Sequence, residues 1–79
     1  MQNSAAKLDA MAVETIIESV CHRYRITRAV FFSQRREKHL LRAQRECAVE
    51  LRKLDMSLPE IGKAMNRDHT VILYYLRTR

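Results

Sequence analysis

The sequence predicts an all-α protein: one small domain of about five helices that contains a helix-turn-helix. Along most of the chain, apolar residues recur three and four positions apart, which is the spacing of one face of an α-helix. No stretch shows the alternation of apolar and polar residues that is typical of a β-strand. One glycine and one proline in 79 residues leave little room for linkers, so we treat residues 1–79 as a single domain.

The first helix is expected to run from Ser4, a residue type that caps helix N-termini, to about Tyr24. Its apolar stripe consists of Leu8, Met11 or Ala12, Val13, Ile16, Ile17, Val20, Cys21 and Tyr24. After a break at residues 25–26, Thr27 is placed to cap a short helical turn that presents Val30, Phe31 and Phe32. We expect the two adjacent phenylalanines to wedge into the core.

The middle of the chain holds its most basic stretch and its clearest helix. Residues 33–39 (SQRREKH) are consistent with a loop or with the start of the next helix. A long helix is predicted from Leu40 to Leu54, because one side carries apolar residues at helical spacing: Leu40, Ala43, Cys47, Leu51 and Leu54.

The segment SLPEIGKAMNRDHT, residues 57–70, has the two helix starts of a helix-turn-helix. Ser57 and Glu60 have the spacing of a capping box, and Pro59 occupies the first turn, where its missing N–H costs nothing. The first helix is expected over about 58–65, and Asp68 is expected to cap a second over about 68–78. The exposed start of that second helix is where recognition helices touch base edges.

The charge pattern points to an anionic partner. The formal net charge is +6, and residues 23–54 carry ten Lys or Arg against three acidic residues. Within that region we expect a phosphate-contacting patch formed by Arg35, Arg36, Lys38, Arg42 and Arg45. A merely solvated helix face is the alternative, but a helix-turn-helix directly after the patch favours nucleic acid.

Catalysis finds no support in the sequence. Gly62 is the sole glycine, which excludes a Gly-rich phosphate loop, and the three histidines lack metal-ligand spacing. We therefore expect no enzyme activity, no cofactor, no bound nucleotide and no metal. Cys21 and Cys47 are expected to be buried thiols of a protein in the reducing cytoplasm. No apolar run approaches the ~18 residues of a membrane span, so a membrane is not an expected partner.

From about Tyr24 onward the chain resembles the C-terminal DNA-binding domain (domain IV) of the bacterial replication initiator DnaA. The resemblance rests on SQRREKHLLRAQR, a serine-led basic loop running into a long helix, and on SLPEIGKAM and NRDHTVIL, two runs close to the family's signature. Residues 13–24 are similar in position to the family's preceding helix, whereas residues 1–12 carry no specific similarity. The resemblance implies a Trp-repressor-like helix-turn-helix.

It also implies roles for individual residues. Arg35, with Arg36 beside it, matches the arginine that enters the minor groove. Asp68, His69 and Thr70 match the base-reading element, and Arg67 matches an arginine near the DNA backbone. Two departures stand out. Val71 replaces the family's second threonine, losing a hydroxyl and keeping a methyl that suits thymine. Met65 and Asn66 replace a glycine pair, and Asn tolerates the left-handed conformation, so we expect the turn to survive.

The expected function is sequence-specific binding of double-stranded DNA at DnaA-box-like sites, in replication initiation, its regulation or transcription regulation. We expect a monomer rather than a dimer. A first alternative is a protein-interaction module that titrates or mimics the initiator, docking a partner from the replication machinery on the acidic residues 1–22. A second is the targeting domain of a transposase-like protein.

Overall fold

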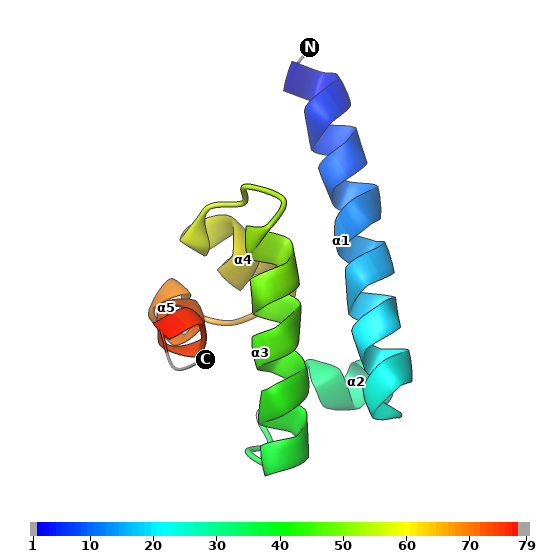
Figure 1. Ribbon diagram of the computed structural model, residues 1–79, viewed down its shortest axis with the longest axis vertical. Coiled ribbons are helices and arrows are strands. Elements are labelled where there is room, and N and C mark those ends of the chain that lie inside the picture. The colour runs from blue at the N-terminus through cyan, green and yellow to red at the C-terminus, as the bar shows by residue number, and fades with distance from the viewer. Residues whose placement is uncertain (1, 78–79) are drawn as a thin grey trace.

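Five helices make up the fold, as the sequence predicts. The computed structural model describes the backbone of residues 2–77 and the side chains of residues 10–77. The helices are α1 (Gln2–Tyr24), α2 (Arg28–Phe31), α3 (Lys38–Arg52), α4 (Leu58–Met65) and α5 (His69–Arg77). Helix α3 is central, with α1 along one side and α4 and α5 on the other (Figure 1). Residues 2–77 contain no strand, so the all-α prediction is confirmed.

Helix α1 differs from the prediction at its start. It begins at Gln2, so Ser4 lies inside the helix and the predicted cap there is wrong, because nothing at residues 2–3 breaks the helix. The stripe is confirmed where α1 meets the other helices: Ile17, Val20 and Cys21 are buried. Met11 is 70 % exposed because the N-terminal part of α1 projects beyond the other helices (Figure 1). Leu8 lies outside the described side chains.

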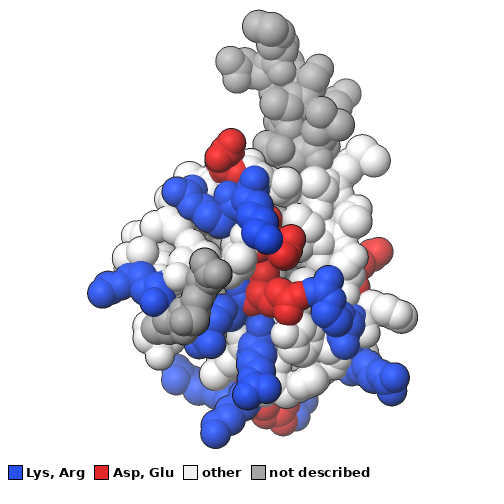
Figure 2. Space-filling model, viewed as in Figure 1, with Lys and Arg blue, Asp and Glu red and all other residues white. Residues whose placement is uncertain are grey.

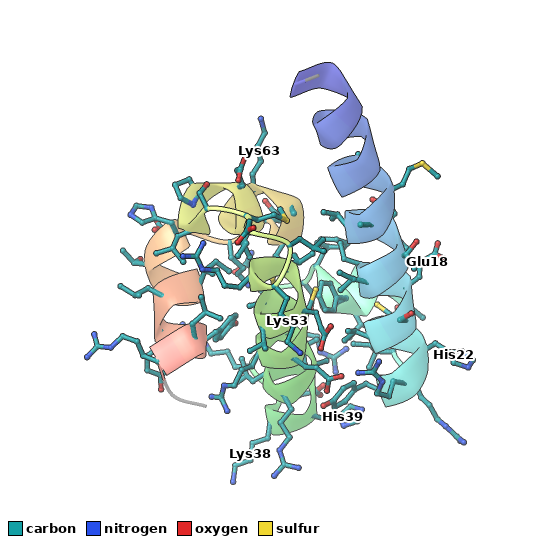
Figure 3. All side chains as sticks on the ribbon, turned by 45° about the horizontal axis from the view of Figure 1, so that its top comes forward. Glu18, His22, Lys38, His39, Lys53 and Lys63 are labelled. Carbon is teal, nitrogen blue, oxygen red and sulfur yellow. The ribbon has the colours of Figure 1, made fainter. Side chains whose placement is uncertain are left out.

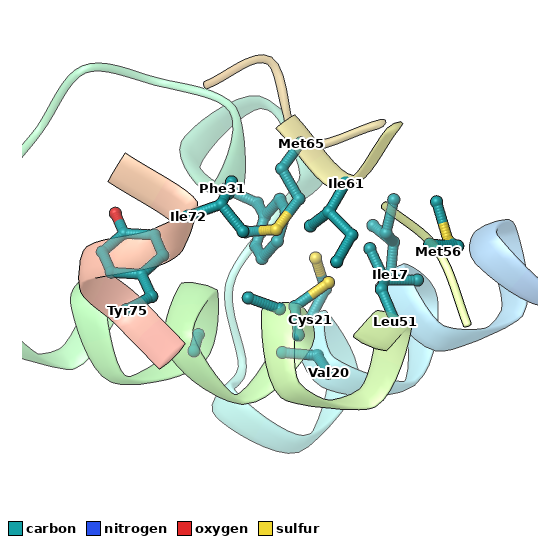
Figure 4. Close-up of a cluster of buried hydrophobic side chains, with 13 residues drawn as sticks. Ile17, Val20, Cys21, Phe31, Leu51, Met56, Ile61, Met65, Ile72 and Tyr75 are labelled. Atoms are coloured by element: carbon teal, nitrogen blue, oxygen red, sulfur yellow. The ribbon is translucent and has the colours of Figure 1, made fainter. Parts of the chain in front are cut away.

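The core gathers side chains from all five helices and from the connection before α4 (Figure 4). Phe31 is fully buried and meets Phe32 edge-on with ring centroids 5.1 Å apart, which confirms Phe31 as the predicted wedge. The one buried polar side chain among the described residues is Gln44, which donates to the Phe31 carbonyl at 2.8 Å. Gln44 also accepts a hydrogen bond from the Tyr75 hydroxyl at 2.7 Å, so its amide is paired on both sides.

Residues 33–39, for which the sequence allows either a loop or a helix start, are divided between the two in the structure. Thr27 caps α2 as predicted, accepting from the Val30 N–H at 3.1 Å. Residues 33–37 form a connection without regular helix, and α3 begins at Lys38, two residues before the predicted Leu40. The helix ends at Arg52, short of the predicted Leu54, and Asp55 then reverses the chain with φ 63°.

The helix-turn-helix follows the predicted capping chemistry. The Glu60 N–H donates to the Ser57 hydroxyl at 3.2 Å, and the Glu60 carboxylate accepts from the Ser57 N–H at 2.7 Å. Asn66 closes α4 in the left-handed conformation (φ 57°, ψ 48°), which confirms that the turn survives without glycine there. The glycine that matters is Gly62, since a Cβ on it would lie 2.5 Å from the Arg67 carbonyl oxygen.

Both cysteines are free and buried, as predicted. Burial raises the pKa of the Cys47 thiol to about 12 and raises that of Cys21 as well. Among the described residues no group of three or more His, Cys, Asp or Glu side chains is placed to hold a metal ion. None of the helices in the described part of the chain is long and apolar enough to cross a membrane.

Candidate nucleic-acid interface

We call residues 33–37 the basic loop. Its start is fixed against α2, because the Ser33 hydroxyl donates to the Val30 carbonyl at 2.7 Å. The same hydroxyl accepts from the Arg35 N–H at 3.4 Å, so it shapes the backbone that carries the arginines. Arg35 and Arg36 are exposed at the far side of this turn. The loop therefore presents two guanidinium groups from an anchored backbone.

Arg35 has a partner within the loop. Its guanidinium donates to the Glu37 carboxylate at 2.7 Å, and both side chains are more than half exposed. An exposed ion pair of this kind contributes little, about 0–1 kcal/mol. Arg35 can therefore exchange Glu37 for a DNA group at small cost. Within the described part of the chain, Arg36 and Lys38 form no ion pair.

The start of α5 presents three exposed polar side chains in a fixed arrangement. Asp68 is the N-cap, and one carboxylate oxygen accepts from both the N–H and the hydroxyl of Thr70, each at 2.9 Å. These two bonds hold the pKa of the Asp68 carboxyl below its usual value. His69 Nδ1 lies 3.4 Å from the same oxygen. The tip thus offers an ionised acceptor, a hydroxyl oxygen and an imidazole to a partner.

Arg67 joins the basic loop to the helix-turn-helix. Its guanidinium donates to the carbonyl of Ser33 and, at 3.1 Å, to the carbonyl of Asn66. The side chain is half-buried between the two segments. The resemblance implied only a place near the DNA backbone; in the structure Arg67 also fixes the distance between the loop and the start of α5.

A hollow of about 460 Å³ lies between the basic loop, α3 and α5. Six residues of the predicted DNA-binding set line it: Arg35, Arg36, Arg45, Arg67, Thr70 and Val71. Four do not. Asp68 and His69 stand at the start of α5, Lys38 lies at the start of α3 (Figure 3), and Arg42 lines a second hollow of about 280 Å³ beside Tyr24. Sequence segments far apart thus meet around one concave surface.

Residues outside the predicted set complete this hollow. Gln34 and Tyr74 line it, and the hydrogen-bonded side chains of Gln44 and Tyr75 lie against it. Tyr74, 60 % exposed, follows Thr70 by four positions, so helical spacing alone places the two on one face of α5. No local pattern marks Gln44, since its role depends on contacts with α2 and α5.

Basic side chains are spread over the face shown in Figure 2, and several of them gather at one end of the molecule. Lys and Arg side chains project around the lower end of α3 (Figure 2), where Figure 1 shows the connection from α2. Two acidic side chains are paired with bases: Glu46 contacts Arg23, and Glu14 contacts Arg28 at 3.1 Å. Arg36 and Lys38, in the basic loop and the first turn of α3, form no ion pair with a described residue, and neither do Lys63 on α4 and Arg77 on α5.

Comparisons with known proteins identify the family of the chain. A family model described as "Bacterial dnaA protein helix-turn-helix" matches residues 13–78. A relative named "Chromosomal replication initiator protein DnaA", from Jannaschia sp. (strain CCS1), is 35 % identical over 69 residues. The match covers 85 % of this chain and 14 % of the relative, so the chain spans a small part of that protein's length. No solved structure matches the chain.

Proposed function

The chain belongs to the bacterial DnaA helix-turn-helix family, a family of DNA-binding domains, and we propose on this basis that it binds double-stranded DNA in a sequence-specific manner. The observation that carries the proposal is the joint presentation of the basic loop and the start of α5 by the Arg67–Ser33 hydrogen bond. A loop suited to the minor groove and a helix tip suited to the major groove are thereby held as one unit.

Each side chain takes a role that its position supports. Arg35 and Arg36 enter the minor groove, where they read groove width and A/T content. Lys38, Arg42 and Arg45 contact phosphates and fix the register without reading sequence. The base edges are read by residues of the α5 tip: Asp68, His69, Thr70 and Val71. Val71 supplies a methyl contact to thymine where a hydroxyl is missing.

The finer proposal is that the targets are DnaA-box-like sites. This proposal is supported by the relative, which is named a chromosomal replication initiator and of which the match covers 14 %. Occupying initiator boxes would make the chain a regulator of replication initiation or of transcription, acting as a monomer on an asymmetric site. We propose no catalytic activity for it.

The interaction-module alternative has less support. It requires an acidic docking face in residues 1–22, where Glu14 is already in an exposed ion pair with Arg28 of the same domain. Of the large apolar side chains described on α1, only Met11 is strongly exposed, and one side chain does not form a docking patch.

The test compares a DnaA-box duplex with a scrambled duplex of equal length across a salt series. A preference for the box at moderate salt would support sequence reading. Equal, steeply salt-dependent binding would show that only phosphates are contacted on these duplexes, and a site selection from random DNA would then identify another target or contradict sequence specificity. Absence of binding to any duplex would contradict the proposal as a whole.

A further inference from the structure

We infer that the 460 Å³ hollow between the basic loop, α3 and α5 is a seat for one backbone phosphate of the bound duplex, with Arg45 as its principal donor. This inference rests on the proposed DNA binding and deepens it. Phosphate contacts by a basic patch need only exposed side chains, whereas a seat needs an enclosed donor and a shaped wall. The hollow supplies both.

Among the arginines that line the hollow, Arg36 is unpaired but exposed on the basic loop, and the enclosed unpaired donor belongs to Arg45. Its Nε is closed off from solvent and has no hydrogen-bond partner, the only such side-chain nitrogen or oxygen in residues 10–77. Native proteins pair nearly all buried donors, because an unmade bond forfeits the solvation that the donor had in water. Arg45 lines this hollow from α3 and also lines the smaller hollow beside Tyr24 and Glu46, and it is in no ion pair with a described residue. Because the Nε is closed off in the free domain, the side chain must turn toward an anion in the hollow before this donor gains a partner.

The surroundings of Arg45 select for an anion. The hollow is lined by four arginines, and none of the described residues that line it is acidic. Arg67 already donates to two carbonyls, and Arg35 to Glu37, so Arg36 and Arg45 are the lining arginines with unused donors. Arg36 is the one proposed for the minor groove, which leaves Arg45 for the phosphate. Gln44 and Tyr75, which bond to each other at 2.7 Å, form no hydrogen bond with Arg45.

The position of the hollow identifies the source of the phosphate. It lies between the loop proposed for the minor groove and the helix proposed for the major groove. The sugar–phosphate strand that separates the two grooves must pass between those elements. The volume exceeds that of a phosphate alone, and the apolar surface of Leu41 on its wall suits the adjoining deoxyribose. A phosphodiester within a duplex therefore fits better than a free phosphate ion.

The experiment replaces single phosphates of the duplex by uncharged methylphosphonates and compares wild type with Arg45→Gln. Wild type should lose about ten-fold in affinity at one position on one strand, and Arg45→Gln should lose nothing further there while remaining sensitive elsewhere. Arg45→Gln should also lower the slope of log K against log salt by about 0.9. Lys63→Gln is the charge-matched control: Lys63 is exposed on α4, far from Lys38 (Figure 3), and should leave the scan unchanged.

Stability measurements separate a binding role from a structural one. Because Arg45 Nε is unpaired, Arg45→Gln should melt at the wild-type temperature or above it. If that variant fails to fold, Arg45→Lys serves in its place; it keeps the charge, should retain the salt slope, and should still lose the position-specific effect.

The outcomes also distinguish this inference from the proposed function. If the wild type binds the box but no methylphosphonate position affects it more than Arg45→Gln, the phosphate seat is overturned and DNA binding is left intact. A wild type that binds no duplex overturns both. Displacement of the duplex by inorganic phosphate at constant ionic strength, through Arg45, would assign the hollow to a free anion and overturn the duplex assignment.

Discussion

The guanidinium of Arg67 donates a hydrogen bond to the carbonyl oxygen of Ser33, linking residues 34 positions apart in the sequence. The bond closes the basic loop onto the turn of the helix-turn-helix. The basic loop and the start of α5, which are proposed to enter different grooves, are thus linked directly by the Arg67 side chain. Their spacing is set before DNA arrives, which lowers the ordering cost of binding.

Arg67→Ala should therefore affect both stability and sequence preference. We expect a loss of about 1–3 kcal/mol in the free energy of unfolding, since two hydrogen bonds from a charged donor disappear. Affinity for the preferred site should fall more than affinity for a scrambled duplex, because the loop loses its register. Urea unfolding and parallel titrations of both duplexes measure these effects; an equal loss on both duplexes would count against a positioning role.

Arg35→Ala should weaken binding to all duplexes and reduce the salt slope by about one. The opposite sign is expected for Glu37→Gln, which removes the carboxylate that holds Arg35 at 2.7 Å and so should strengthen binding. Titrations at several salt concentrations check both variants. An unchanged slope for Arg35→Ala would exclude a groove or phosphate contact.

His69→Ala should cost about 1–3 kcal/mol on the preferred site and little on random DNA, as expected for a side chain that contacts base edges. His22→Ala is the matched control, because His22 is an exposed histidine on α1 (Figure 3). Competition binding measures the loss of affinity of each variant on the preferred site and on random DNA. Similar losses on both would mean that the α5 tip does not read bases.

Gly62→Ala should destabilise the domain by about 1–3 kcal/mol, although alanine favours helices elsewhere. The new Cβ would lie 2.5 Å from the Arg67 carbonyl oxygen, so the turn would have to move. Lys63→Ala, the neighbouring exposed position, should change stability by less than about 0.5 kcal/mol. Thermal or urea unfolding of both variants decides the point, and equal stabilities would show that the turn is free to adjust.

The capping carboxylate of Asp68 makes stability depend on acid pH. Its two hydrogen bonds from Thr70 lower its folded-state pKa, so the ionised form stabilises the fold above the unfolded pKa. This contribution should be lost as pH falls through the lowered value, below the ordinary 3.8. Unfolding curves of wild type and Asp68→Asn between neutral pH and pH 2 should converge over that window. Parallel curves would contradict the linkage.

Local chemistry explains which features were predictable from sequence. The capping box of Ser57 and Glu60, the Asn66 turn and the Asp68 cap depend on residues within a few positions, and all three are present. The two differences on α1 have different causes. Met11 has the right spacing for the core but lies where α1 extends past the other helices, and Ser4 is a good cap inside a longer helix.

The interface shows the same division. The basic loop and the α5 tip were predictable from a motif, but the bond from Arg67 to Ser33 and the unpaired Arg45 Nε arise only when α3, α5 and the loop are packed together. Gln44 illustrates the reason. It is an unremarkable polar residue in a helix until Phe31 and Tyr75 are placed on either side of it.

The two buried cysteines make this chain convenient for spectroscopy. Thiol-reactive dyes attack the thiolate, and burial raises the pKa of both native thiols, that of Cys47 to about 12. A cysteine introduced at the exposed Met11 would react far faster than either native one. A dye on α1 could then report, by energy transfer to a labelled duplex end, which way the domain faces along its site, without removing any native cysteine.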